Sequence, residues 1–218
     1  MPRKVFDSHL EELHVDLIRM GSMAEKQLFQ SIEALVNQDE VLAKKVVEND
    51  DIIDDMQKEI EGKAIRLIAM QQPLAMDLRN IFTTTKIVTD LERMADHAVD
   101  IAKVVKRLKN EKPIKPLLDI PRMAGIVREM MRESLDAYVS GDVDRAYEIC
   151  KKDDDIDAIY KQVFSELLLM MMEDPKAINH AAQYLFICKY LERIADHTTN
   201  ICESTIYLVT GEQIDLNE

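Results

Sequence analysis

The sequence predicts an all-α protein of two tandem three-helix bundles, with six long helices in total. Composition is the first reason. Among 218 residues there are five glycines, six prolines and no tryptophan, and aromatic residues make up 5%. Leu, Ile, Ala, Met, Glu and Lys fill the chain instead, and these residues favour helices. A hydrophobic fraction of 47% is enough for packed cores and excludes a disordered chain.

An internal duplication is the second reason. Residues 91–101 read LERMADHAVDI and residues 191–201 read LERIADHTTNI, which are identical at seven of eleven positions. Upstream, the match continues between residues whose numbers differ by 103, for example Ser31 with Ser134, Asp39 with Asp142 and Asp54 with Asp157. Each half, at about 100 residues, is long enough to bury its own core. We therefore expect residues 1–110 to form the first bundle and residues 111–218 the second.

Signals for helix ends divide each half into three helical segments. Asp39 and Asp142 are suitable N-caps, and Asp174 stands before Pro175, which suits a first helical position. Gly141 suits the residue after a helix C-terminus. The expected helices lie near residues 6–37, 40–71 and 74–109, and near residues 121–140, 143–173 and 175–209.

Apolar spacing and proline positions predict how these helices connect. From Leu91 to Leu108, apolar residues recur every three or four positions, as in an amphipathic helix. Short loops between long helices favour antiparallel neighbours, so each half should run up, down and up. Pro113, Pro116 and Pro121 do not suit a helix interior, so we expect residues 110–121 to link the halves.

The charge and the cysteines limit the function. A net charge of −13 repels phosphate backbones, which excludes nucleic-acid binding, and favours cations or a basic protein partner. The N-terminal residues form no apolar signal segment, and no run approaches the roughly 18 apolar residues of a membrane span. We expect a cytoplasmic protein without membrane insertion. Cys150, Cys188 and Cys202 lack CxxC spacing and indicate reduced thiols that pack between helices.

Acidic stripes repeat on two helices of each half. Glu92, Asp96 and Asp100 are spaced i, i+4, i+8, so they share one helix face, roughly opposite the apolar one. We expect them on the outside of the bundle. Asp51 and Asp55 form a further pair in the first half only. The other candidate ligands are Asp50 and Asp54 in the first half, and Asp153, Asp157, Glu192, Asp196 and Asn200 in the second.

These stripes have two interpretations. A solvated face is the ordinary one, because acids are common on helix exteriors. However, like charges at i, i+4 destabilise a helix by about 0.2–0.5 kcal/mol per pair, and this spacing recurs on two helices of each half. We therefore favour bound cations, and oxygen ligands suit Mg, Ca, Mn or ferric iron. Because Asn200 brings no charge, the second site should bind the more weakly.

Other residues near the motif have ordinary roles. His97 and His197 flank the acidic stripe, where a packing or hydrogen-bonded role weighs at least as much as ligation. Arg93 and Arg193 should pair with the acids. A di-iron bundle enzyme is poorly supported, because Glu11-x-x-His14 has no counterpart in the second half.

The run Leu167–Met172 is apolar on every side of its helix, whereas the matching residues 64–69 include Arg66. A helix that is apolar all round needs an extra neighbour. Two explanations stay open at this point. One is deep burial within the bundle, and the other is a subunit or partner interface rich in adaptable methionine.

The paired motifs, with QPLAMDLR at residues 72–79, closely resemble the PhoU family over essentially the whole chain. The resemblance implies tandem three-helix bundles, ExxxD motifs that carry iron or zinc clusters, and no catalysis; Mg or Mn also fits the ligands. It implies a negative regulator of phosphate uptake and phosphate-starvation signalling, acting on the membrane phosphate ABC transporter and its sensor histidine kinase. We also expect a homodimer. Asn200 departs from the motif, which can hold an acid there.

Two alternatives to this function stay open. One is a metalloenzyme that uses bridging carboxylates for hydrolytic or redox chemistry, and the other is a helical scaffold without metal.

Overall fold

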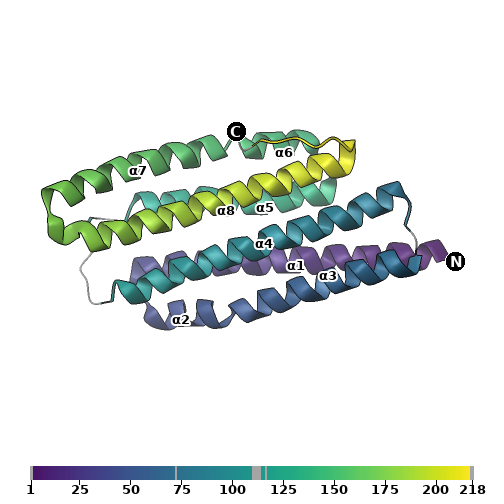
Figure 1. The fold of residues 1–218 in the computed structure, drawn as a ribbon, viewed down its shortest axis with the longest axis horizontal. Helices are drawn as coiled ribbons and strands as arrows, with labels where there is room; N and C mark the ends of the chain where they lie inside the picture. Colours follow the sequence, from purple (N-terminus) through teal and green to yellow (C-terminus); the bar gives the residue numbers. More distant parts are fainter. Residues whose placement is uncertain (1, 72, 110–113, 116, 217–218) are drawn as a thin grey trace.

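A computed structural model describes residues 2–71, 73–109, 114–115 and 117–216, and within these ranges it consists of helices without strands (Figure 1). The first half contains α1 Pro2–Asn37, α2 Glu40–Glu48, α3 Asp50–Gln71 and α4 Ala75–Arg107. The second contains α5 Asp119–Ser140, α6 Val143–Cys150, α7 Asp153–Glu173, the short 3-10 helix η1 Pro175–Ala177 and α8 Ile178–Thr210. The predicted all-α class with six long helices is confirmed.

The predicted capping residues stand at the starts and ends of helices, as expected. The Asp39 carboxylate accepts hydrogen bonds from the first backbone N–H groups of α2, and Asp142 does the same for α6. Gly141 follows α5 with a φ of 66°, a left-handed conformation that glycine adopts without strain. Asp174 caps η1, with Pro175 at its start.

The middle helix of each half is broken, although the sequence predicts one continuous helix there. The expected helix over 40–71 stops at Glu48 and resumes at Asp50, and that over 143–173 stops at Cys150 and resumes at Asp153. Runs of aspartate begin at both resumption points, and aspartate favours helix starts over helix interiors. Each break therefore puts one of the candidate acids, Asp50 or Asp153, in the first turn of a new helix.

The boundaries of the proposed linker also shift. Residues 110–113 and 116, which include Pro113 and Pro116, lie outside the described residues. Pro121 belongs to the first turn of α5, not to the linker. Proline is tolerated there because the first turn leaves its backbone N–H groups without helical partners. At the other end of the chain, α1 begins at Pro2, earlier than the expected residue 6.

The two halves pack along one long contact. The long helices alternate in direction within each half, and α4 lies against α8 while α1 lies against α5 (Figure 1). The buried apolar residues of both halves belong to one continuous cluster. We call the contact between α4 and α8 the seam. Because the core crosses it, the division into separate folding units 1–110 and 111–218 stays a prediction.

Three further features bear on function. Among the described helices, none has the length and apolar character needed to cross a bilayer. The three cysteines are free thiols, with Cys188 and Cys202 buried and Cys150 half-buried. In the run Leu167–Met172, only Leu167 is fully buried, and Leu168, Leu169 and Met172 are exposed. Deep burial of this run is therefore the wrong explanation of its apolar character.

Candidate metal centre

The acidic stripes of the first half meet in the groove between α3 and α4. These helices pack together, with Asp50 and Asp54 at the start of α3 and Glu92 and Asp96 midway along α4. Burial raises the pKa of the Glu92 carboxyl, and repulsion from Asp96, Asp54 and Asp50 raises it further. The groove therefore concentrates negative charge from two helices in a poorly solvated place.

This position corrects the expectation that the stripe lies on the outside of the bundle. Only 16% of the Glu92 side chain is exposed, against 40% for Asp96 and 36% for Asp100. Arg93 pairs with Glu92 at 3.4 Å and with Asp96 at 3.5 Å, as predicted. Lys103 pairs with Asp100 at 3.1 Å. The i, i+4 face borders the apolar stripe closely enough for its acids to be half-buried by the neighbouring helix.

Asp50 has a hydrogen-bond partner on α1 that was not predicted from the sequence. Gln27 Nε2, on α1, donates a hydrogen bond of 3.1 Å to Asp50 Oδ1. Gln27 is buried, so its amide must find its hydrogen-bond partners on the helices that pack against α1. Burial raises the pKa of Asp50, and this hydrogen bond opposes the rise. A glutamine on the apolar face of α1 was the sequence signal for this contact, because a buried polar group needs a hydrogen-bond partner.

The second half repeats the arrangement between α7 and α8. Asp153 and Asp157 lie on α7, and Glu192 and Asp196 lie on α8. Burial raises the pKa of Asp153 to about 6, with repulsion from Asp196, Asp157 and Glu192 adding to the effect. Burial and Glu192 likewise raise the pKa of Asp196. Lys189 offsets part of this charge by donating to Glu192 at 2.6 Å.

The structure distinguishes these acids from their sequence neighbours. Asp50, Asp54, Asp153 and Asp157 are half-buried, as the candidate set requires. The neighbouring acids are exposed instead, namely Asp51, Asp55, Asp154 and Asp155. The further pair of the first half, Asp51 and Asp55, therefore faces solvent and does not belong to the groove.

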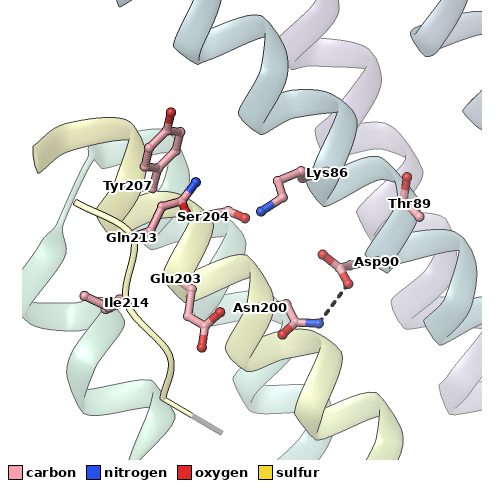
Figure 2. Close-up of a pocket in the computed structure, with 9 residues that line it drawn as sticks. All are labelled: Lys86, Thr89, Asp90, Asn200, Glu203, Ser204, Tyr207, Gln213 and Ile214. Carbon is pink, nitrogen blue, oxygen red and sulfur yellow. Dashed lines mark hydrogen bonds between the residues drawn. The ribbon is translucent and has the colours of Figure 1, made fainter. Parts of the chain in front are cut away.

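Asn200 lies at the seam, bonded to a residue of the other half. Its Nδ2 donates to Asp90 Oδ1 at 3.1 Å (Figure 2). His197 Nδ1 lies 2.9 Å from the same oxygen. At the matching place across the seam, Tyr190 stacks on His97 with ring centroids 5.7 Å apart. The two histidines thus pack and hydrogen-bond across the seam. Asp90 was not predicted, because only the fold brings it to Asn200.

A hollow of about 560 Å³ opens at the seam between the two motifs. Its walls include Asp96, Asp100 and Asp196 beside His97 and His197. Burial, with electrostatic effects of His197 and Arg193 added to it, lowers the pKa of His97 to about 4. His97 is therefore neutral at pH 7. Both motif copies line the same hollow.

The donor chemistry suits hard cations. All the candidate side chains offer oxygen atoms, and such atoms bind Mg, Mn, Ca or ferric ions. Asp153 Oδ1 is buried without a hydrogen-bond partner among the described residues. A bound cation would supply the interaction that this oxygen lacks. Nevertheless, no three His, Cys, Asp or Glu side chains in the described ranges converge closely enough to hold a metal as they stand. Metal binding by these residues stays a prediction.

The isolated Glu11-x-x-His14 pair has another role. His14 Nε2 lies 2.7 Å from Asn80 Oδ1, and its ring packs edge-on against Tyr138 with centroids 5.7 Å apart. His14 therefore ties α1 to α4 and α5, and nothing in this contact resembles a di-iron ligand set.

Comparisons with known proteins agree with this duplicated arrangement. The PhoU domain model matches residues 17–105 and again residues 120–205. The chain is 62% identical, over the full length of both proteins, to a phosphate-specific transport system accessory protein PhoU homolog of Clostridium acetobutylicum.

Solved structures show the same fold. The crystal structure of PhoU from Pseudomonas aeruginosa superposes with a TM-score of 0.91 at 36% identity, covering 95% of this chain and 100% of that one. The phosphate transport system regulatory protein PhoU from Streptococcus pneumoniae gives 0.90 at 33% identity, covering 96% and 99%. The chain therefore belongs to the PhoU domain family.

Proposed function

We propose that this chain is a cytoplasmic negative regulator of phosphate uptake and phosphate-starvation signalling. It would act on the membrane phosphate ABC transporter and its sensor histidine kinase. The observation that carries the proposal is the 62% identity, over both full lengths, to an accessory protein of phosphate-specific transport. The Streptococcus pneumoniae relative is named a regulatory protein of the same system. These names favour an accessory role without catalysis.

The charge of the chain supports action through a partner. With a net charge of −13, the protein repels free phosphate as well as anionic polymers. A regulator of this kind is better suited to contacting the proteins that transport and sense phosphate than to capturing phosphate itself. Its action as a homodimer is part of the proposal, and sedimentation at micromolar concentration would measure it.

Deletion of the gene tests the regulatory role. We expect phosphate-starvation genes to stay expressed in high phosphate when the protein is absent, and the intact gene supplied in trans to restore repression. A reporter for a starvation-induced promoter measures both. Normal repression in the deletion strain would refute the proposal.

Metal binding at the two carboxylate groups is the second part of the proposal. Asp50, Asp54, Glu92, Asp96 and Asp100 would hold ions in the first half, and their partners in the second half would be Asp153, Asp157, Glu192 and Asp196. A cation there would neutralise repelling carboxylates and tie two helices together. The resemblance favours iron or zinc, and the oxygen ligands also suit Mg or Mn.

Two measurements separate this proposal from its alternatives. A metal-free helical scaffold predicts no bound ion by elemental analysis of untagged protein. A carboxylate-bridged metalloenzyme predicts hydrolytic or redox turnover that depends on Glu92 and Asp96. The regulator predicts bound metal, loss of repression on deletion and no turnover.

A further inference from the structure

An apolar stripe covers the outward face of the second half of α7. Phe164, Leu168, Leu169 and Met172 have exposed fractions of 43%, 45%, 59% and 74%. Their spacing places them along one side of the helix. The opposite side of α7 packs on α5 and α8 through buried residues such as Val163 and Leu167. We call these four exposed residues the α7 stripe; it lies on a helix at the edge of the molecule (Figure 1).

The first half shows that the fold does not require this stripe. The residues that match it on α3, at positions lower by 103, are Glu61, Ile65, Arg66 and Ala69. The residues that match the buried Val163 and Leu167 are Ile60 and Ala64, which are also buried. The two helices therefore pack in the same way, yet three of the four outward positions lack a large apolar side chain on α3. Packing of α7 does not explain why they are apolar.

The surroundings of the stripe indicate which partner would cover it. Helix α7 carries six acidic side chains and one lysine. Exposed Asp154 and Asp155 stand at its start, and exposed Glu173 and Asp174 at its end. If the α7 stripe of a second copy docked here, these acids would meet the same acids of that copy and repel them, and they would also repel an anionic membrane. A partner with positive charge beside an apolar face is complementary in both respects.

We propose that the α7 stripe docks an amphipathic helix of another protein, with lysine or arginine beside its apolar face. The stripe runs over nine residues of α7, from Phe164 to Met172, or about 12 Å, which matches the apolar face of two to three turns of a partner helix. Met172 and the leucines can adapt to such a face, since flexible side chains accommodate different partners. The proposal goes beyond the regulatory role, because it holds whichever protein supplies the helix.

A peptide pair and a charge-neutral variant test the proposal. The probe is a synthetic helix of about 18 residues made of leucine and lysine with one leucine face, and its control is an isomer of the same composition with the leucines scattered around the helix. The variant Phe164→Glu/Leu169→Arg/Met172→Ala introduces residues that α3 carries at the matching positions. It adds one acid and one base, so the net charge stays at −13.

Fluorescence anisotropy should show that the unaltered protein binds the amphipathic peptide and that the variant binds at least about tenfold more weakly, since buried apolar anchors dominate such interfaces. The isomer should bind both proteins equally weakly. Equal affinity of the two proteins for the amphipathic peptide would overturn the proposal. It would also be overturned if the unaltered protein dimerised in sedimentation and the variant did not, because the occupant would then be a second copy.

The reciprocal variant tests the same idea by gain of binding and does not depend on the first variant folding. Glu61→Phe/Arg66→Leu/Ala69→Met builds the α7 stripe on α3, again without changing the net charge. We expect the peptide stoichiometry measured by calorimetry to rise from one to two. An unchanged stoichiometry in a protein with an unchanged helical circular dichroism spectrum would contradict the proposal.

Discussion

The acidic clusters of the two halves share a motif but differ in the residue that packs against the first acid of each cluster. In the first half, Gln27 donates a hydrogen bond to Asp50. In the second half, the residue that matches Gln27 is the buried Met130, which has no amide to donate. Asp153, which matches Asp50, keeps an oxygen without a hydrogen-bond partner and has its pKa raised to about 6. A residue on a neighbouring helix thus opposes the rise in the pKa of Asp50, and its counterpart gives Asp153 no such hydrogen bond.

The seam shows a second difference between the halves. Asp90 accepts a hydrogen bond from Asn200, whereas the residue that matches Asp90 is Tyr190, which stacks on His97. Asp100, which matches Asn200, pairs with Lys103 instead. An acid at position 200 would place two carboxylates together. The change from acid to amide in the second motif is therefore explained by Asp90 and need not reflect the metal site.

The largest effect is expected from removing the acids of one half. Glu92→Gln/Asp96→Asn should weaken metal binding by the first half about 100-fold or more, and Glu192→Gln/Asp196→Asn should do the same for the second. The first half should be the tighter site, because Asp100 adds a charge that Asn200 lacks. Calorimetric titration of manganese into both variants measures the ranking. If the first variant keeps the tighter site the ranking is wrong, and if both bind like the unaltered protein these acids are not the ligands.

The next effect tests the seam. Asn200→Asp should destabilise the protein by about 2 kcal/mol, because a partly buried hydrogen bond to Asp90 is replaced by repulsion between like charges. Adding Asp90→Asn should restore most of the stability. Urea unfolding measures both, and Asp100→Asn is the matched control that should change little. If the second substitution restored no stability, repulsion from Asp90 would not be the reason that an acid at position 200 destabilises the protein.

Local patterns predicted much of this molecule, and long-range contacts account for what they missed. The duplication is visible when the sequence is compared with itself, and the caps at Asp39 and Asp142 and the spacing within each acidic stripe depend on residues within a few turns of one another. The contact between Asp90 and Asn200 joins residues 110 positions apart, and that between Gln27 and Asp50 depends on how α1 packs. The half-burial of Glu92 likewise depends on the neighbouring helix. No periodicity within one helix contains this information.

A smaller effect follows from the raised pKa of Asp153. Its folded-state pKa of about 6 exceeds the ordinary value of 3.8, so folding favours the protonated carboxyl. Stability from this group is present below pH 4 and is lost as the pH rises through 6. Asp153→Asn should therefore stabilise the metal-free protein at pH 7, by about 1 kcal/mol after allowing for solvent screening.

Thermal melting in chelator between pH 5 and 7.5 measures this effect. The unaltered protein should melt at a lower temperature as the pH rises, and Asp153→Asn should flatten that dependence. The exposed neighbour Asp154, changed to Asn, is the control and should leave the slope in place. If Asp153→Asn keeps the full slope, other groups cause it.

The smallest effect is expected from exchanging the two residues that pack against the acids, Gln27 and Met130. This exchange is the most direct test of the comparison. Met130→Gln should supply Asp153 with the amide that Asp50 already has, and Gln27→Met should remove it from Asp50. A hydrogen bond to the charged form favours that form, so the first change should lower the pKa of Asp153 and the second should raise that of Asp50. We expect about 0.5–1 kcal/mol at pH 7 in each case, with opposite signs. Unfolding of metal-free protein in urea measures the sign.

A double-mutant cycle then shows whether the acid is the cause. Glutamine at position 130 is itself a polar group in a buried place, and without a partner it would destabilise the protein. In an Asp153→Asn background the amide no longer meets a carboxylate, so Met130→Gln should give no gain there. A gain of equal size in both backgrounds would show that the glutamine acts through packing alone. A gain confined to the protein with Asp153 intact would establish that a buried amide on α5 stabilises the charged form of Asp153.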